Sequence, residues 1–299
     1  MNRKKNVRGA LLSVFAGICW GLSGCMGQYL FQYQGMDSHW LVPVRLSLAG
    51  AVLLVFSLFK YGSKEVLRPF REKRDTLELL IYGLAGISAC QFFYFYTIQL
   101  ANASFATIMQ ELAPLMILLV MCVMERRLPA PREIFCIAIA FTGVVLITTH
   151  GNFSSLAVPA SSIIAGLVCA VCIVVYSIVP ARLLTRHPIP ILQGWAFLMG
   201  GILFFLVFRS WSYGYVPGKM GLFGIVFVVI VGNVLAFVSF MSGLKLIGPD
   251  KSSLYAFSEP LSASAASVLL LHGSFTGFEA AGFALVFLML FILSKDKNR

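Results

Sequence analysis

Charged residues are scarce in this sequence. Asp, Glu, Lys and Arg make up 12% of the 299 residues, while hydrophobic residues make up 59%. A soluble domain carries roughly 25% charged residues. A chain of this length has too much apolar surface to bury in one or two aqueous cores, so a lipid bilayer must act as its solvent. The scarcity of charge excludes a soluble protein and predicts an all-α membrane protein.

Motifs for hydrolytic, metal and cofactor chemistry are also lacking. Gly218 and Lys219 lack the upstream Gly and the following Ser or Thr of a phosphate-binding loop. Neither a Gly-x-Ser-x-Gly elbow nor a His-Glu-x-x-His pair occurs. The histidines are scattered at segment ends, at His39, His150, His187 and His272. The sequence therefore predicts no enzyme, no cofactor and no metal site.

The positions of the cysteines also argue against metal or redox chemistry. The seven cysteines all lie in apolar stretches, and Cys169 and Cys172 have no polar neighbours. A redox or metal-binding pair is the alternative there, but small residues that pack helices are the favoured interpretation.

Long apolar stretches fill the chain, and each approaches the ~20 residues that a spanning helix needs. The first stretch follows a basic N-terminus, as in a secretion signal, but it exceeds the ~7–15 apolar residues of a signal core, so we expect a retained helix. Ten spans are predicted, at 9–30, 39–60, 77–98, 103–124, 132–149, 161–182, 189–208, 221–244, 252–271 and 277–294.

The basic residues predict the orientation of these spans. If the helices alternate from a cytoplasmic N-terminus, 20 of the 23 Lys and Arg residues lie on the cytoplasmic side. Arg209 and Lys219 lie outside, and Arg45 lies within a span. This bias predicts a multi-pass protein of the cell (inner or cytoplasmic) membrane with both termini cytoplasmic. It also explains the net charge of +11 without nucleic acid as a partner.

An internal repeat is predicted from a shift of 146 residues. Overall identity under this shift is near chance, but similar residues recur at corresponding places in the predicted spans. Because each half holds an odd number of helices, the second must be inserted upside down, as in many secondary transporters. We expect two inverted five-helix repeats, 1–149 and 150–299. The matches are Gly86 with Gly232, Leu100 with Leu246, Pro114-Leu115 with Pro260-Leu261, and Glu133 with Glu279.

Three ionisable residues fall within predicted spans, where charge is costly and marks function by default. Glu111 and Glu259 are candidate proton sites or contacts to a substrate ammonium, and Glu111 has the alternative of a structural partner for Arg45. Arg45 is either a snorkelling anchor or a partner for one of these carboxylates or for a substrate carboxylate. Pro114 and Pro260 follow the two carboxylates and predict helix breaks.

Polar and aromatic residues in other spans are candidates for the lining of a cavity, because an unpaired amide in lipid is unfavourable. For each Tyr, Trp or Ser, the alternative is an interfacial or packing role. In the predicted span 9–30, Gly17 and Gly21 are spaced for the close approach of another helix. The lining candidates are Gln28, Trp20, Gln91, Tyr94, Asn233 and Tyr176, with Ser23, Tyr96, Gln193, Trp195, Tyr255 and Ser262 as further members.

The sequence resembles the drug/metabolite transporter superfamily, specifically its EamA-type ten-helix permeases. The resemblance covers almost the whole chain as two copies, and its motifs are loose. The second copy departs from the first: Leu271-His272-Gly273 stands where the first copy has Glu125, and Met289 replaces Gly143. The residues that carry the resemblance are Ile18-Cys19-Trp20-Gly21, Arg45, Ala103-Ser104, Leu112-Ala113-Pro114-Leu115, Glu125-Arg126-Arg127-Leu128, Glu133, Gly143-Val144 and Pro260.

The resemblance implies a central cavity with alternating access and export of small metabolites such as amino acids or amines. We therefore expect a secondary transporter whose partners are a small-molecule substrate, the lipid bilayer and, as a candidate coupling ion, protons. The alternatives are a channel-like facilitator and a lipid- or headgroup-handling membrane protein. Glu111 has no counterpart in the family pattern, so its role is inferred from its place in the span alone.

Overall fold

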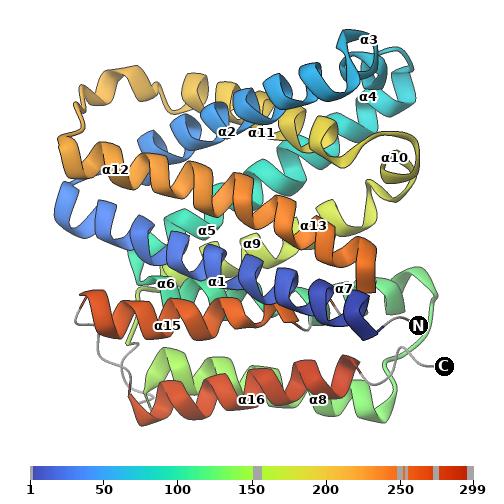
Figure 1. The fold of residues 1–299 in the computed structure, drawn as a ribbon. Coiled ribbons are helices and arrows are strands. Elements are labelled where there is room, and N and C mark those ends of the chain that lie inside the picture. Colours follow the sequence, from blue (N-terminus) through green and yellow to red (C-terminus); the bar gives the residue numbers. More distant parts are fainter. Residues whose placement is uncertain (1–2, 151–156, 248–251, 253–254, 272–275, 295–299) are drawn as a thin grey trace.

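The computed structural model describes residues 3–150, 157–247, 252, 255–271 and 276–294, and these residues form helices and no strand (Figure 1). In chain order the helices are α1 (Arg3–Gln34), α2 (Ser38–Tyr61), α3 (Ser63–Val66), η1 (Arg68–Phe70), α4 (Lys73–Leu80), η2 (Ile81–Ser88), α5 (Ala89–Leu100), α6 (Ala103–Gln110), α7 (Ala113–Met124), α8 (Pro131–Thr149), α9 (Ala160–Ile178), α10 (Ala181–Arg186), α11 (Ile189–Val207), η3 (Ser210–Tyr213), α12 (Lys219–Phe227), η4 (Val228–Leu235), α13 (Ala236–Ile247), α15 (Ser258–Leu271) and α16 (Gly277–Ser294).

The described residues contain eight helices that are long and apolar enough to cross a membrane. They correspond to the first eight predicted spans. Helix α15 has 14 residues, and part of the predicted span 252–271 lies outside the described residues. The predicted span 161–182 is too long, because α9 ends at Ile178. Pro180 follows two residues later, and its missing N–H and fixed φ favour a helix end.

Two long helices each contain a π-helical segment at a corresponding place. Segment η2 lies between α4 and α5, and segment η4 lies between α12 and α13; each has eight residues. A glycine lies in each segment where another helix approaches. A Cβ on Gly86 would lie 2.8 Å from Cβ of Tyr176, and a Cβ on Gly232 would overlap the Ser23 hydroxyl. Such π segments are rare and occur often at functional sites.

Glycines in α1 position the start of α15. A Cβ on Gly17 would lie 2.6 Å from the Ala256 carbonyl oxygen, and one on Gly21 would lie 2.5 Å from the Glu259 carbonyl oxygen. The predicted close helix approach is therefore confirmed. It brings the backbone of Glu259 directly against α1.

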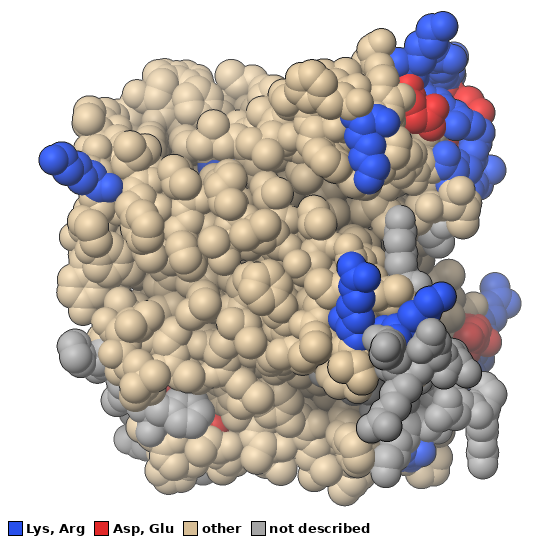
Figure 2. All heavy atoms as spheres, viewed as in Figure 1, with Lys and Arg blue, Asp and Glu red and all other residues tan. Residues whose placement is uncertain are grey.

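The ends of the bundle differ in charge. Helix α1 begins and α16 ends at the same end, which also holds α3, the start of α4 and α10 (Figure 1). We call it the terminus-side end. The start of α12 lies at the opposite end. Figure 2 shows most Lys and Arg side chains of the visible face at the terminus-side end, beside an uncharged band across the middle. The segments 61–75 and 211–219 thus lie at opposite ends, as alternating spans require.

Candidate functional site

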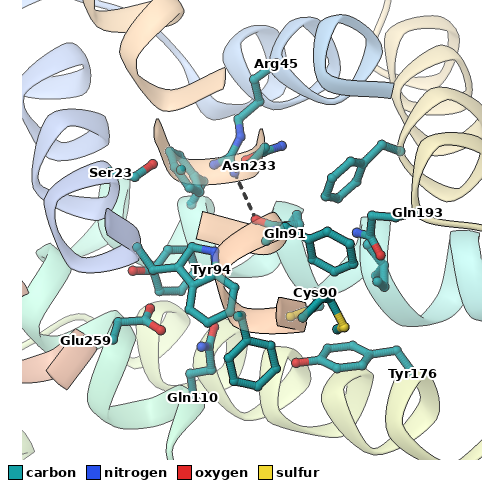
Figure 3. A pocket seen from close by; sticks show the side chains of 18 residues that line it. Ser23, Arg45, Cys90, Gln91, Tyr94, Gln110, Tyr176, Gln193, Asn233 and Glu259 are labelled. Carbon is teal, nitrogen blue, oxygen red and sulfur yellow. Dashed lines mark hydrogen bonds between the residues drawn. The ribbon is translucent and has the colours of Figure 1, made fainter. Parts of the chain in front are cut away.

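A cavity of about 160 Å³ lies between helices of both halves of the chain. Its walls come from α1, α2, η2, α5 and α6 in the first half and from α9, α11, η4, α13 and α15 in the second (Figure 3). Polar side chains gather here, inside an otherwise apolar bundle. They are Ser23, Arg45, Gln91, Tyr94, Gln110, Tyr176, Gln193, Asn233 and Glu259.

Arg45 is the buried cation of this cavity. Its side chain extends from α2 and is only 2% exposed. One guanidinium nitrogen, Nη2, donates to Oε1 of Gln91 at 3.1 Å and to Oδ1 of Asn233. The guanidinium also stacks 3.8 Å from the ring centre of Phe95. The snorkelling hypothesis is therefore wrong, because the planar group finds amide and aromatic partners inside the protein.

Among the described residues, Arg45 pairs with no carboxylate either. Within the described residues its guanidinium donates to amide oxygens only, and Nε and Nη1 have no hydrogen-bond partner. The hypothesis that Glu111 or Glu259 neutralises Arg45 is therefore not supported by a direct ion pair. Two amides hold the guanidinium in place without cancelling its charge.

Several hydrogen-bond donors on this side of the cavity lack partners among the described residues. They are Nε and Nη1 of Arg45 and Nδ2 of Asn233. An unsatisfied buried polar group costs about 1–3 kcal/mol, more if it is charged. A solute or water molecules that offer acceptor oxygens would remove this cost. The arrangement suits an anionic group such as a carboxylate, whose oxygens accept charge-assisted hydrogen bonds.

Glu259 enters the cavity from the side opposite Arg45, together with Gln110 (Figure 3). It lies in the first turn of α15, directly before Pro260, and is 5% exposed. Within the described residues its carboxylate has no cationic partner, and the Tyr94 hydroxyl is its polar neighbour. The cavity thus has a cationic side and an acidic side.

Glu111 does not line this cavity. Helix α6 ends at Gln110 and α7 begins at Ala113, so Glu111 lies in the break that precedes Pro114. Consecutive helical residues point in directions about 100° apart. Gln110 therefore faces the cavity, and Glu111, the residue predicted from the sequence, does not. Gln110 was not among the residues singled out from the sequence.

Gln28 does not line the cavity either. Its Oε1 accepts the Ala103 backbone N–H at 2.9 Å, and its Nε2 donates to Gln32 at 3.4 Å. The Asn102 side chain accepts the Phe105 N–H at 2.8 Å in the same turn. Together Gln28 and Asn102 satisfy donors that the start of α6 would otherwise leave unpaired.

The remaining lining candidates come together at the cavity. Trp20 packs 5.3 Å from Phe240, ring centre to ring centre, and Tyr176 lies on the α9 wall. Gln91, Tyr94 and Asn233 surround Arg45 (Figure 3). Of the further candidates, Ser23 and Gln193 line the cavity, whereas Trp195 donates to the Val66 carbonyl 2.9 Å away. Sequence analysis missed Cys90, which its apolar surroundings made look like a packing residue.

Residues 146 positions apart face the same cavity. Such a pattern is expected if two related halves contribute the same helix faces to a shared site. The first member of each pair comes from η2 or α5 and the second from η4 or α13. The pairs are Ile87 with Asn233, Gln91 with Phe237, Tyr94 with Phe240 and Phe95 with Met241.

A multi-pass helical bundle around a cavity with ionisable and polar side chains is the architecture of a membrane transporter. The chain belongs to the EamA-like transporter family, which it matches over residues 7–149 and again over residues 160–295.

Curated relatives carry transporter names. The chain is 30% identical over 292 residues to the uncharacterized inner membrane transporter YicL of Salmonella typhimurium, covering 98% of this chain and 97% of that protein. It is 22% identical over 251 residues to the uncharacterized transporter YyaM of Bacillus subtilis, covering 81% and 78%. A protein of known crystal structure shares the fold, with a TM-score of 0.65 at 20% identity over 97% of this chain and 99% of its own.

Proposed function

We propose that this protein is a secondary transporter that exports a small zwitterionic metabolite, such as an amino acid, or a related amine, by alternating access. The observation that carries the proposal is the placement of Arg45 and Glu259 on opposite sides of one buried cavity. A membrane protein bears the cost of burying two ionisable groups when they bind or couple a solute.

The cavity suggests how a zwitterion would lie. Its carboxylate would accept hydrogen bonds from one of the free Arg45 donors, Nε or Nη1, and from Nδ2 of Asn233. Its ammonium group would face Glu259 and Gln110. A cavity of about 150 Å³ holds a molecule of the size of benzene, so the observed cavity of about 160 Å³ suits a solute with few heavy atoms.

The alternating-access part of the proposal treats residues 1–149 and 150–299 as two inverted five-helix repeats. Three features support it. The family matches the chain twice, once in each half. Segments η2 and η4 occupy corresponding places. Glu133 and Glu279, in the first turns of α8 and α16, each accept the backbone N–H three residues earlier, at 2.6 and 2.7 Å.

The proposed orientation in the membrane and the proposed coupling to protons both rest on the positions of charged residues. The gathering of basic side chains at the terminus-side end supports cytoplasmic termini (Figure 2). Glu259 is the proposed proton site, because a buried carboxylate can exchange its proton only when the cavity opens to water. Glu111 lies outside the cavity lining, so its proposed coupling role is secondary.

A transport assay with matched variants tests the function. Purified protein in liposomes should carry radiolabelled amino acids with saturable kinetics, and Glu259→Gln should change the dependence of flux on the pH gradient. Tyr255→Phe is a suitable control on the same chain segment, because Tyr255 is exposed and does not line the cavity. No saturable flux of any amino acid or amine tested would reject the function. Counterflow separates a carrier from a channel-like facilitator, which shows none.

A further inference from the structure

A cluster of acidic and basic side chains joins α4 to α10 at the terminus-side end, away from the cavity. We call it the α4–α10 cluster, and it consists of Glu72, Asp75, Glu78, Arg182, Arg186 and His187. Arg182 bonds to Asp75, and its Nε lies 3.0 Å from Oε1 of Glu78. Arg186 binds both oxygens of Glu72, at 2.5 and 2.7 Å, and also Asp75 at 3.0 Å.

Asp75 is the centre of this cluster. Its side chain is 2% exposed and accepts from both arginines and, at 2.8 Å, pairs with Nε2 of His187, whose side chain is 1% exposed. A buried carboxylate with cationic partners is strongly destabilised when those partners are removed. At the rim, the Arg186 guanidinium holds the pKa of the Glu72 carboxyl below its usual range. The cluster is therefore a cohesive network with a buried centre.

The cluster connects the two halves of the chain close to the cavity walls. Helix α4 continues through η2 into α5, which carries Gln91 and Tyr94. Helix α10 links α9, which carries Tyr176, to α11, which carries Gln193. When the cluster is formed, these cavity walls are held together at the terminus-side end.

The corresponding positions 146 residues away hold no charge. The acidic positions correspond to glycines of α12 and its N-cap, and the arginine positions correspond to apolar residues around the α1–α2 connection. The pairs are Glu72 with Gly218, Asp75 with Gly221, Glu78 with Gly224, Arg182 with Met36 and Arg186 with Trp40.

Those residues close the opposite end of the bundle by packing. A Cβ on Gly221 would lie 3.1 Å from Cε of Met36, and one on Gly224 would lie 2.5 Å from Cδ2 of Leu30. The Trp40 and Tyr215 rings lie 5.1 Å apart. The two ends of the bundle are thus joined by different contacts: ion pairs at the terminus-side end and, at the other, packing together with a hydrogen bond from the Tyr215 hydroxyl to the Gln34 carbonyl oxygen at 3.0 Å.

We propose that the α4–α10 cluster is an ionic gate, which must dissociate before the cavity opens at the terminus-side end. This inference rests on the proposed alternating access. Opening at this end requires the charged groups to leave their ion-pair partners and become hydrated. Opening at the other end separates α12 from the α1–α2 connection without breaking ion pairs. Weakening the cluster therefore shifts the protein toward conformations open at the terminus-side end.

Cys90 offers a reporter for this opening, because it lines the cavity and is buried. Membrane vesicles of both orientations would be treated with a membrane-impermeant thiol reagent, and modification of Cys90 would be followed by peptide mass spectrometry. The variant Arg182→Gln/Arg186→Gln removes both cations, and Arg182→Lys/Arg186→Lys keeps them as a matched control. Glu72→Gln is a milder variant at a side chain that is 53% exposed, and Lys219→Gln is a control at the opposite end.

The Gln variants should raise the rate of Cys90 modification from the terminus side by roughly five- to tenfold. Lys219→Gln should stay near the wild-type rate, and the Lys pair should show a smaller increase than the Gln pair, because lysine keeps the charge but cannot bind both oxygens of Glu72. If the double Gln variant fails to fold, Glu72→Gln should still show a smaller increase from the same side. Unchanged rates in monodisperse Gln variants, or equal increases from both sides, would overturn the gate. The readout needs no substrate, so it remains interpretable if the proposed transport activity fails.

Discussion

The guanidinium of Arg45 donates a hydrogen bond to the side-chain oxygen of Asn233, a residue 188 positions away in the other half of the chain. Gln91 receives a second bond from the same nitrogen. Because both bonds use Nη2, the Nε and Nη1 donors of the guanidinium have no partner among the described residues and are available to a solute. One cation thus both links the two halves and offers free donors.

Arg45→Lys should weaken transport although it preserves the charge. A lysine cannot reach both amides and still present donors of fixed direction to a carboxylate. The lost charge-assisted hydrogen bonds, about 1.5–3 kcal/mol each, correspond to roughly a 10- to 100-fold rise in the apparent KM. Initial rates of uptake into liposomes measure this. An unchanged KM in Arg45→Lys would contradict a carboxylate-binding site at Arg45.

Glu259→Gln and Glu111→Gln should differ in effect. Glu259 lines the cavity, whereas Glu111 lies in the break between α6 and α7. We expect Glu259→Gln to abolish the response of flux to a pH gradient and Glu111→Gln to retain most of it. Flux measured with and without an imposed gradient decides between them. A larger loss in Glu111→Gln would contradict the assignment of the coupling site.

The helices that cross the bundle could be predicted from the sequence because long apolar stretches leave few alternatives for the backbone. Arg45 and Glu259 were also visible, since charge inside such stretches is rare. Corresponding positions, such as Glu133 and Glu279, indicated a repeat where overall identity did not.

Which residues of each helix point into the cavity could not be predicted, because this depends on the rotation of the helix about its axis. Segments η2 and η4 insert wider turns, so an α-helical periodicity loses register beyond residues 81 and 228. The break after Gln110 has a similar consequence, because Gln110 lines the cavity in place of the predicted Glu111. Gln28 was misassigned because its partner, the Ala103 N–H, is a tertiary contact.

Gly50→Ala should destabilise the bundle where α2 packs on α11. A Cβ at Gly50 would lie 2.5 Å from the backbone nitrogen of Leu198 and 2.8 Å from its Cα. Backbone atoms cannot move aside as a side-chain tip can, so we expect a cost of about 1–3 kcal/mol. Gly277→Ala is the matched control, because a Cβ there has no neighbouring atom within 4 Å among the described residues. Thermal unfolding in detergent should show a lower Tm for Gly50→Ala alone; equal Tm values would contradict the packing.

Asp37→Ala should reduce stability in a pH-dependent manner. Asp37 caps α2 by accepting the His39 N–H at 2.7 Å, and it accepts from Gln99 at 3.0 Å. Burial alone would raise the pKa of Asp37, but the hydrogen bonds from Gln99 and His39 outweigh it and leave the pKa below its usual range. Because the folded pKa is lowered, the stabilisation is present above the unfolded value of about 3.9 and is lost as pH falls through the folded pKa.

The loss at neutral pH should be about 1 kcal/mol, the usual value of an N-cap. Melting curves of wild type, Asp37→Ala and Asp37→Asn at pH 7 and near pH 3 would measure it. Asp37→Asn keeps a capping oxygen without the charge and should fall between the other two at neutral pH. A deficit in Asp37→Ala that stays undiminished near pH 3 would show that the carboxylate charge is not involved.

The most direct test of the account is counterflow in liposomes that contain purified protein and a saturating unlabelled amino acid inside. A carrier with one cavity open to alternate sides should draw labelled amino acid inward to a transient overshoot, and Arg45→Gln should abolish that overshoot. Labelled uptake that rises without saturation or overshoot, and equally in Arg45→Gln, would contradict the account.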